Sequence, residues 1–548
     1  MFFPDEGSRE YLAISWLNRR LIENWEKSLQ TPKKSQEKLL FSMIQKASYT
    51  AFGEAHGFHK IKTLSDWRQN VPIRRFSSFK PWIDRMISGE RNILTAEKTI
   101  QFVETSGTTG DPKWIPVTSS WSKVVSDAQK LWVLGMLRDF YCLGRGKQLS
   151  ITSAGQHTQT TTGIPVGSNT GRMVDKQPSW VKRNLISSSS LPLELTSEQR
   201  QYVILRLALQ ESISCWVTAN PSMVLLMCRR LEEWSDELSY DLKNGTLKAG
   251  PATKIPQKWK KILEQKMRKT GVPYRFKPAY IWPLELVCCW KGGPARYFAS
   301  LLPDALGADI PIREVGVSAS EGHFSIPMDS GMSGGPLWLM GHVLEFESEG
   351  SVYWAWELEE GKQYKMIITT QSGLYRYDLQ DTVEVVGFYK KTPIVRFVGK
   401  SGRFLNSVGE KVSEEQVSLA IQSVAQKLSV VFIGYTFRIE WSEVPRIRCA
   451  VELGVAPTPA LIQKIEECID LELKSLNIEY ESKRKSGRMQ HLVVENLPEH
   501  SYARYRASLV EQGAPEGQVK DLILVQSEDS WKKARMMMIN PFEEAQNL

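Results

Sequence analysis

The first ninety residues carry apolar positions at helical spacing. The segment LLFSMIQKA (39–47) is representative, and the pattern predicts that residues 10–90 are mostly helical. After Gly89 the apolar residues instead form short runs, which is the pattern of strands. The predicted strands are TIQFV (99–103), KWIPVT (113–118) and KQLSIT (147–152).

Helices alternate with these strands farther along the chain. An amphipathic helix is predicted from about Trp121, with Ser119 or Ser120 as its cap. SCWVTA (214–219) is a predicted strand, and Asn220-Pro221-Ser222 supplies a cap signal for the helix that follows. PIREVGVS (311–318) is a further predicted strand. This alternation favours an α/β architecture with a largely parallel sheet.

The last two hundred residues show two other patterns. From about residue 350, SVYWAWEL, YKMIITT, DTVEVVGF and TPIVRFVG follow one another, which predicts a β-rich and more antiparallel subdomain. From about Ser413 the order becomes helix, strand, strand, helix, strand, helix, an α+β unit large enough to fold as a domain. The glycines and polar residues of KSGRFLNSVGEK (400–411) could form a hinge. The predicted domains are 1–400, a hinge at 401–411, and a small, mobile cap at 412–548.

Composition excludes several classes of protein. The 548 residues are 42% hydrophobic and 24% charged, with a formal net charge of +9, as in ordinary globular proteins of more than one domain. The Lys/Arg runs at 400–403 and 481–488 are short, so we expect solvated surfaces and no nucleic-acid partner. Seven scattered cysteines and seven histidines show no disulfide framework or zinc spacing. No apolar run spans a bilayer, so we expect a cytoplasmic protein without a membrane partner.

One polar loop between two predicted strands suggests chemistry. Thr105-Ser106-Gly107-Thr108-Thr109-Gly110 offers backbone N–H groups and hydroxyls that could surround phosphate oxygens, and Lys113 follows. Its spacing differs from the GxxxxGK[ST] loop of kinases and GTPases. A polar hairpin turn explains the same residue types, so the loop alone leaves both interpretations open.

Three further stretches carry candidate site residues. SASEGHF (318–324) combines small residues with Glu321, whose carboxylate oxygens suit Mg²⁺. In GLYRYDLQDTVEVVGF (373–388), Asp381 is expected at the lip of a strand, where it could bind ribose hydroxyls or could be a surface turn carboxylate. Lys520 lies in a late loop, GAPEGQVKDLILV (513–525), where a lone lysine usually faces solvent.

The order of these motifs resembles the adenylate-forming enzymes. TSGTTGDPK, SASEG, YRYDLQD, a hinge ending in NSVGEK and a late loop lysine are most similar to the Gretchen Hagen family of acyl-acid amido synthetases. That family conjugates plant hormones such as auxin and jasmonate to amino acids. The resemblance covers nearly the whole chain, because SYTAFGEAHGF, VPIRRF, ISGERNILT, IPVGSNTG and TANPSMVLLM are also similar.

The resemblance implies a large N-terminal adenylate-forming domain and a smaller mobile cap, which together activate a carboxylic acid with ATP and Mg²⁺ and join it to an amine, expected to be an amino acid. We expect the protein to be a monomer. The resemblance also implies that Lys113 closes the phosphate loop, that Glu321 holds Mg²⁺ and that Lys520 neutralises charge during adenylation. The implied nucleotide-binding residues are Ser106, Gly107, Thr108, Thr109, Ser320, Asp381 and Lys400.

Three positions depart from the family pattern. Val317 replaces an aromatic residue expected to stack on adenine, Gln380 replaces a glycine, and Lys400 replaces an arginine whose bidentate fork lysine cannot reproduce. Two alternatives therefore stay open beside the amide-forming ligase. One is an acyl-CoA ligase that uses the same adenylate, and the other is a degenerate member that binds a small acid or nucleotide without catalysis.

Overall fold

The computed structural model describes residues 9–105, 113–140, 143–514, 516 and 519–539. The chain divides into two compact units, Met1–Gly292 with Leu302–Phe397, and Gly293–Leu301 with Val398–Leu548. Each unit is described on its own below. No helix in the described ranges combines the length and the apolar character needed to cross a bilayer.

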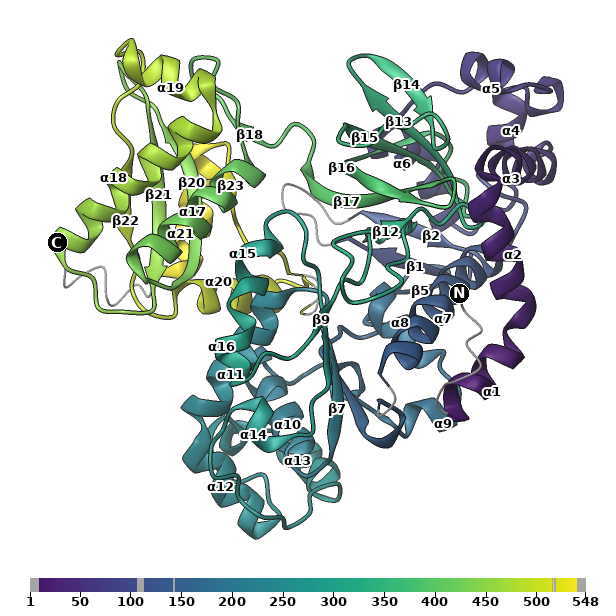
Figure 1. Cartoon of the computed structure of the whole chain (residues 1–548). Helices are drawn as coiled ribbons and strands as arrows, with labels where there is room; N and C mark the ends of the chain where they lie inside the picture. The colour runs from purple at the N-terminus through teal and green to yellow at the C-terminus, as the bar shows by residue number, and fades with distance from the viewer. Residues whose placement is uncertain (1–8, 106–112, 141–142, 515, 517–518, 540–548) are drawn as a thin grey trace. The chain divides into compact units, whose positions relative to one another are not determined.

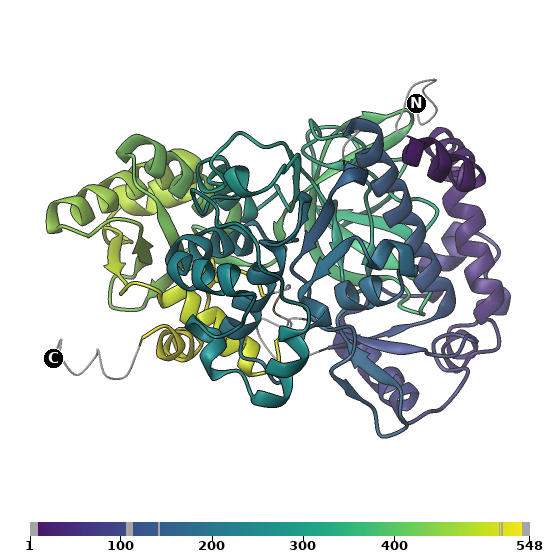
Figure 2. The same ribbon diagram turned by 90° about the horizontal axis from the view of Figure 1, so that it is seen from below.

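The first unit begins with helices, as predicted for residues 10–90. A capping box between Thr63 and Asp66 starts one of them, and the Thr50 hydroxyl caps another. Apolar residues of the first two helices, including Trp25 and Leu29, belong to one hydrophobic cluster with residues of the long helix α7 (Ser119–Asp139), and Figures 1 and 2 show these purple helices on the outside of the unit. The helices are α1 (Arg9–Leu17), α2 (Arg19–Gln30), α3 (Pro32–Ala47), α4 (Ala51–Ala55), η1 (Phe58–Lys60), α5 (Leu64–Asn70) and α6 (Phe76–Ile87).

A small sheet combines two strands that precede α7 with two that follow it. Its order is β2-β1-β5-β4, with β1 (Gln101–Glu104) antiparallel to β2 (Trp114–Val117) and parallel to β5 (Pro165–Gly167), while β4 is Thr158–Gln159. The predicted cap of α7 was wrong, because the helix begins at Ser119 and its N-cap is Thr118, whose hydroxyl accepts from the Trp121 N–H. Two short helices follow, α8 (Asn169–Asp175) and α9 (Ser179–Lys182).

The predicted parallel sheet is confirmed, in the order β6-β3-β7-β8-β9 with every neighbouring pair parallel. Asn220 caps the helix after β7, as predicted. The strand predicted over 311–318 is shorter, because Gly316 at φ +91° turns the backbone away. The strands are β3 (Lys147–Ser150), β6 (Leu185–Ser187), β7 (Ile213–Val217), β8 (Leu286–Cys288) and β9 (Ile312–Arg313); the helices are η2 (Leu143–Arg145), η3 (Ser188–Ser190), α10 (Ser197–Ala208), α11 (Pro221–Glu233), α12 (Ser235–Asn244), η4 (Gly250–Lys254), α13 (Gln257–Glu264), α14 (Pro278–Ile281) and α16 (Leu302–Leu306).

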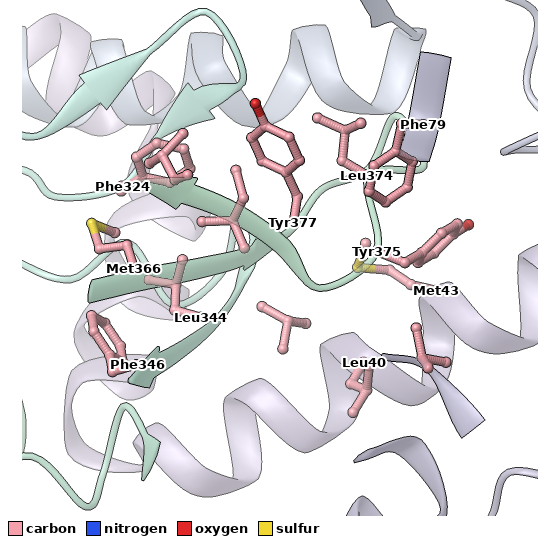
Figure 3. Packing of buried hydrophobic residues seen from close by; sticks show 14 of the residues in the cluster. Leu40, Met43, Phe79, Phe324, Leu344, Phe346, Met366, Leu374, Tyr375 and Tyr377 are labelled. Atoms are coloured by element: carbon pink, nitrogen blue, oxygen red, sulfur yellow. The ribbon is translucent and has the colours of Figure 1, made fainter. Parts of the chain in front are cut away.

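The β-rich subdomain is also confirmed. Its sheet has the order β12-β17-β16-β15-β13-β14, and pairing is antiparallel between β12 and β17, β16 and β15, β15 and β13, and β13 and β14. One face packs on the N-terminal helices through a cluster that includes Leu40, Phe79, Phe346 and Met366 (Figure 3). The strands are β12 (Gly335–Pro336), β13 (Val343–Ser348), β14 (Ser351–Trp354), β15 (Gln363–Thr369), β16 (Tyr377–Tyr389) and β17 (Thr392–Lys400).

The second unit combines helices with the four-stranded sheet β22-β21-β20-β23. A capping box between Ser413 and Gln416 starts its first long helix, and the helix and strand order predicted from Ser413 is confirmed. The predicted domain bounds stay predictions. The elements are α15 (Ala295–Ser300), β18 (Phe404–Leu405), β19 (Val412–Ser413), α17 (Glu414–Leu428), β20 (Phe432–Glu440), β21 (Arg446–Leu453), α18 (Pro459–Leu476), α19 (Ile478–Lys485), β22 (Val493–Asn496), α20 (Ser501–Glu511), β23 (Leu524–Val525) and α21 (Glu528–Met538).

Candidate active site

The polar loop connects the two antiparallel strands β1 and β2. At its base the Thr105 N–H donates to the Lys113 carbonyl at 3.0 Å. The Lys113 ammonium lies 5.6 Å from the centre of the Phe76 ring on α6, a cation–π contact. The predicted phosphate-binding residues Ser106, Gly107, Thr108 and Thr109 lie outside the described residues, so their roles stay predictions.

Ser320 and Glu321 form the turn between two very short strands, β10 (Ser318–Ala319) and β11 (Gly322–His323), which pair through Ala319 and Gly322. The Trp121 indole N–H on α7 donates to the Glu321 carbonyl at 2.7 Å and anchors this turn. Gly322 is required beside Glu321, since a Cβ there would lie 2.5 Å from His342 Nε2. The turn is therefore held by both α7 and the core behind it.

The Glu321 carboxylate is buried beside a neutral partner. Only 6% of the residue is exposed, and its side chain is hydrogen-bonded to the Tyr377 hydroxyl on β16. Figure 3 shows that this hydroxyl points away from Leu344 and Leu40 of the cluster. Burial, and then the charge of Glu321, raises the pKa of Tyr377 far above its ordinary value, so the phenol stays protonated and donates. No lysine, arginine or histidine in the described part of the chain forms an ion pair with Glu321.

Asp381 lies on the same strand as Tyr377, and its charge also raises the pKa of Tyr377. The expectation that Asp381 is at the lip of a strand, or on a surface turn, was wrong: it is 5% exposed and four residues inside β16.

A bulge in β16 explains this position. Asp378 pairs with Ile367 and Thr382 with Lys365, so the three residues 379–381 face a single residue of β15. Gln380, at φ +60°, adopts the left-handed conformation that the glycine of the family pattern would adopt more easily. The bulge therefore changes the orientation of the strand at Asp381 without ending it. The sequence pattern did not reveal this bulge.

Val317 is 6% exposed and belongs to the hydrophobic cluster beneath the sheet. Its N–H donates to the Ser325 hydroxyl at 2.9 Å, and its carbonyl accepts from the Phe324 N–H at 2.8 Å. This side chain therefore supports the Glu321 turn through core packing.

Lys400 and Lys520 belong to the second unit. Lys400 is the last residue of β17 and is half-buried, whereas Lys520 is exposed in the extended segment before β23. Arg506 fixes that segment on both sides of the lysine, because it donates to the Val519 carbonyl at 3.1 Å and to Asp521 at 2.9 Å. The backbone on both sides of Lys520 is thus held by Arg506.

Two residues of this arrangement were missed by the sequence interpretation. Tyr377 lies within YRYDLQD, four residues before Asp381, but nothing in the sequence pairs it with a glutamate 56 residues earlier. Trp121 was assigned only to the start of a helix. Trp121 lies in the first turn of the helix that follows β2. That position, close to the end of the polar loop, was the available sign that its side chain could reach the site.

In fold, the chain is similar to solved structures of acyl acid amido synthetases. It superimposes on an AtGH3.15 acyl acid amido synthetase in complex with 2,4-DB with a TM-score of 0.80, at 19% identity, covering 95% of this chain and 96% of that one. A 2-hydroxyisobutyryl-CoA ligase in the postadenylation state, in complex with 2-HIB-AMP, gives a TM-score of 0.53 at 10% identity over 92% and 90%. These likenesses define the fold class that the motif order predicted.

The sequence comparisons define the family. Residues 21–312 match the GH3 family N-terminal domain, residues 339–400 the central domain and residues 415–529 the C-terminal domain. The chain therefore belongs to the GH3 family, as its resemblance to the Gretchen Hagen enzymes predicted. An indole-3-acetic acid-amido synthetase GH3.4 of Arabidopsis thaliana is 22% identical over 90% of this chain and 89% of its own length. A jasmonoyl–L-amino acid synthetase JAR6 of Nicotiana attenuata is 20% identical over 85% and 86%.

Proposed function

We propose that this protein is an ATP-dependent ligase that activates a carboxylic acid as an acyl-adenylate and transfers the acyl group to an amine, namely an amino acid. The observation that carries the proposal is the buried Glu321 carboxylate, which faces a neutral phenol and forms no ion pair within the described residues. Membership of the GH3 family, whose relatives above are amido synthetases, supports the same reaction.

The donor set fits Mg²⁺. A buried carboxylate without a basic partner has a negative charge to offer, and Mg²⁺ in nucleotide sites is usually held by one or two carboxylates together with phosphate oxygens. The described residues hold no cluster of three or more acidic, histidine or cysteine side chains that could bind a metal alone, which agrees with a site completed by the nucleotide. When bound, Mg²⁺ would neutralise charge on the phosphates.

The first half-reaction joins two anions. A carboxylate oxygen of the acid attacks the α-phosphorus of ATP, a new O–P bond forms, and pyrophosphate leaves with the electrons of the broken P–O bond. The barrier is largely electrostatic, so cations along the phosphates lower it. We assign Ser106, Gly107, Thr108, Thr109 and Lys113 to the phosphates.

The other residues orient the adenylate and close the site. We assign Glu321 to Mg²⁺, Ser320 and Asp381 to the nucleoside, and Lys400 and Lys520 to the nucleotide when the predicted cap closes. Tyr377 positions the Glu321 carboxylate, because a protonated phenol donates a hydrogen bond to it.

In the second half-reaction an unprotonated amine attacks the acyl carbonyl, a C–N bond forms, and AMP leaves with the C–O bond electrons. The amine must lose one proton overall, so the amide-forming step requires a proton acceptor. We expect the enzyme to act in the cytoplasm as a monomer on small molecules, without nucleic acid or membrane.

Acid-dependent ATP–pyrophosphate exchange tests the proposal directly. A panel of carboxylic acids should include at least one that drives exchange, and added amines should then yield amide and AMP. Coenzyme A in place of the amine tests the acyl-CoA alternative, which thioester formation without amide would favour. A wild-type protein that shows no exchange with any acid would instead support the non-catalytic alternative.

Variants test the residue roles. Lys520→Ala should slow exchange but spare amide formation from a preformed adenylate. Glu347→Gln removes a carboxylate from β13, where it pairs with Lys365, and serves as a matched control that should leave exchange unchanged.

A further inference from the structure

Arg172 is a buried arginine with only neutral partners. It lies on α8 and is 4% exposed. One terminal nitrogen donates to the Ser122 hydroxyl at 2.7 Å and the other to the Asn169 side-chain carbonyl at 3.0 Å. Its Nε is buried and has no hydrogen-bond acceptor, and no carboxylate among the described residues pairs with the guanidinium.

This guanidinium is next to the candidate active site. Its central carbon lies 5.1 Å from the centre of the Trp121 ring. The edge of the same indole donates through Nε1 to the Glu321 carbonyl. Arg172 therefore covers the face of a ring whose edge anchors the turn assigned to Mg²⁺.

The charge of Arg172 is costly without a counter-ion. Burial lowers the pKa of Arg172 to about 10, so the side chain remains a cation at neutral pH. A cation–π contact and two neutral hydrogen bonds recover only part of the desolvation penalty, which is several kcal/mol per buried ion. Such uncompensated charges are typical of sites that bind an oppositely charged ligand.

Two other buried arginines show the structural alternative. Arg376 is paired with Glu345 at 2.9 Å. Arg206 donates to two backbone carbonyls and is stabilised by the charge of Asp241. Each of these arginines is therefore stabilised by an acidic residue, whereas no acidic side chain in the described part of the chain forms an ion pair with Arg172.

We propose that Arg172 binds a second carboxylate of the acid substrate, so that the preferred acids are dicarboxylic. The inference rests on the proposed function, because it assigns the acid subsite of that reaction. The reacting carboxylate has to reach the nucleotide beside Glu321, whereas the guanidinium lies over the indole face. Its hydrogen bonds to Ser122 and Asn169 use two of the five guanidinium N–H donors, so others remain for a carboxylate, which arginine binds with strong, oriented hydrogen bonds.

Matched pairs of acids test this assignment in the exchange reaction. Glutarate, adipate, isophthalate and terephthalate are each compared with their monoamides, which keep the shape and remove one charge. For the best pair, the wild type should favour the dicarboxylate in kcat/KM by at least about 30-fold, as expected for a hydrogen bond between charged groups. Arg172→Met should reduce that ratio to about one without changing the KM for ATP, and Arg172→Lys should retain part of it.

A purely structural role predicts a different result. Arg206→Met, the control, should lower the melting temperature and change the rates with both members of a pair by the same factor. If Arg172→Met behaves in this way, or if the wild type favours the monoamides, the assignment is overturned.

A binding measurement without nucleotide distinguishes failure of the proposed function from failure of the Arg172 assignment. If no acid drives exchange in the wild type, the melting temperature is measured with each dicarboxylate in the absence of nucleotide. A rise in the wild type and in Arg172→Lys, absent in Arg172→Met, would support the carboxylate site independently of catalysis. No rise in the wild type would overturn it.

Discussion

Two buried carboxylates of the first unit, Glu345 and Glu321, have opposite surroundings. Glu345 is 1% exposed and accepts from Arg376 Nε at 2.9 Å, Arg68 Nε at 3.1 Å and the Trp67 indole at 3.2 Å. Glu321 is 6% exposed and has the neutral Tyr377 hydroxyl as its side-chain partner. The first charge is already compensated by the fold, and the second is available to a bound cation. Burial of an acid therefore indicates a binding site only when its partners are neutral.

The largest expected effect concerns the compensated carboxylate. Glu345→Ala leaves Arg376 buried without its partner, so the free energy of unfolding should fall by about 3 to 5 kcal/mol. Denaturant unfolding measures this loss. Glu347→Ala, which removes a half-exposed pair on the same strand, is the control and should cost about 1 kcal/mol or less. A loss of similar size in both variants would show that the buried ion pair of Glu345 contributes no more stability than the half-exposed pair of Glu347.

The next effect concerns the uncompensated carboxylate. Glu321→Gln keeps the shape and a hydrogen-bond acceptor for Tyr377 but removes the charge, so acid-dependent exchange should fall by about 10²- to 10³-fold, the size typical of losing one preorganised electrostatic contact. The melting temperature should stay the same or rise, since a buried charge is removed. A large drop in melting temperature with exchange retained would place Glu321 with Glu345 as a structural residue.

A third buried carboxylate, Glu314, is intermediate between Glu345 and Glu321 in how far its charge is compensated. Glu314 accepts from the backbone N–H groups of Lys291, Val315 and Gly316, and burial raises its pKa from 4.5 to about 7 despite these bonds and the Lys291 charge. Because the folded state binds this proton more tightly than the unfolded state, stability should fall as the pH rises from 4.5 to 7, by about 3 kcal/mol. Thermal melts across this range should show the fall in the wild type and a smaller one in Glu314→Gln. An identical pH dependence in both proteins would contradict the raised pKa.

The smallest effect concerns the bulge that presents Asp381. Gln380→Gly relieves a left-handed backbone conformation at φ +60° and should raise the free energy of unfolding by about 0.5 to 1 kcal/mol. Thr382→Gly, in the regular part of the same strand, should lower it, because glycine weakens a strand interior. Chemical denaturation of both variants checks the sign, and a loss of stability in Gln380→Gly would mean that the glutamine side chain stabilises the bulge.

The sequence predicted the elements whose signals are local. The helix at 414–428 follows from its apolar period and from Ser413 and Gln416, which form a capping box within four residues. The strand predicted over 311–318 fails at Gly316, where the positive φ depends on close packing: a Cβ there would lie 2.4 Å from the Ser325 carbonyl. Local patterns do not show such contacts.

The site was predicted only as separate motifs. The resemblance predicted roles for Glu321 and Asp381, but the hydrogen bond between Glu321 and Tyr377 depends on tertiary contact between the turn and β16. Arg172 was not singled out, because a buried cation with only neutral partners is visible only once the neighbours of Trp121 are known. Sequence order thus indicated the family chemistry, and tertiary structure indicated which charges remain available.

The Mg²⁺ dependence of acid-driven pyrophosphate exchange, measured in the wild type and in Glu321→Gln with the best acid of the panel, tests the central assignment most directly. We predict that exchange in the wild type rises to saturation with Mg²⁺, and that the variant needs far more Mg²⁺ or shows no exchange at any concentration. The same Mg²⁺ dependence and the same maximal rate in both proteins would contradict the account.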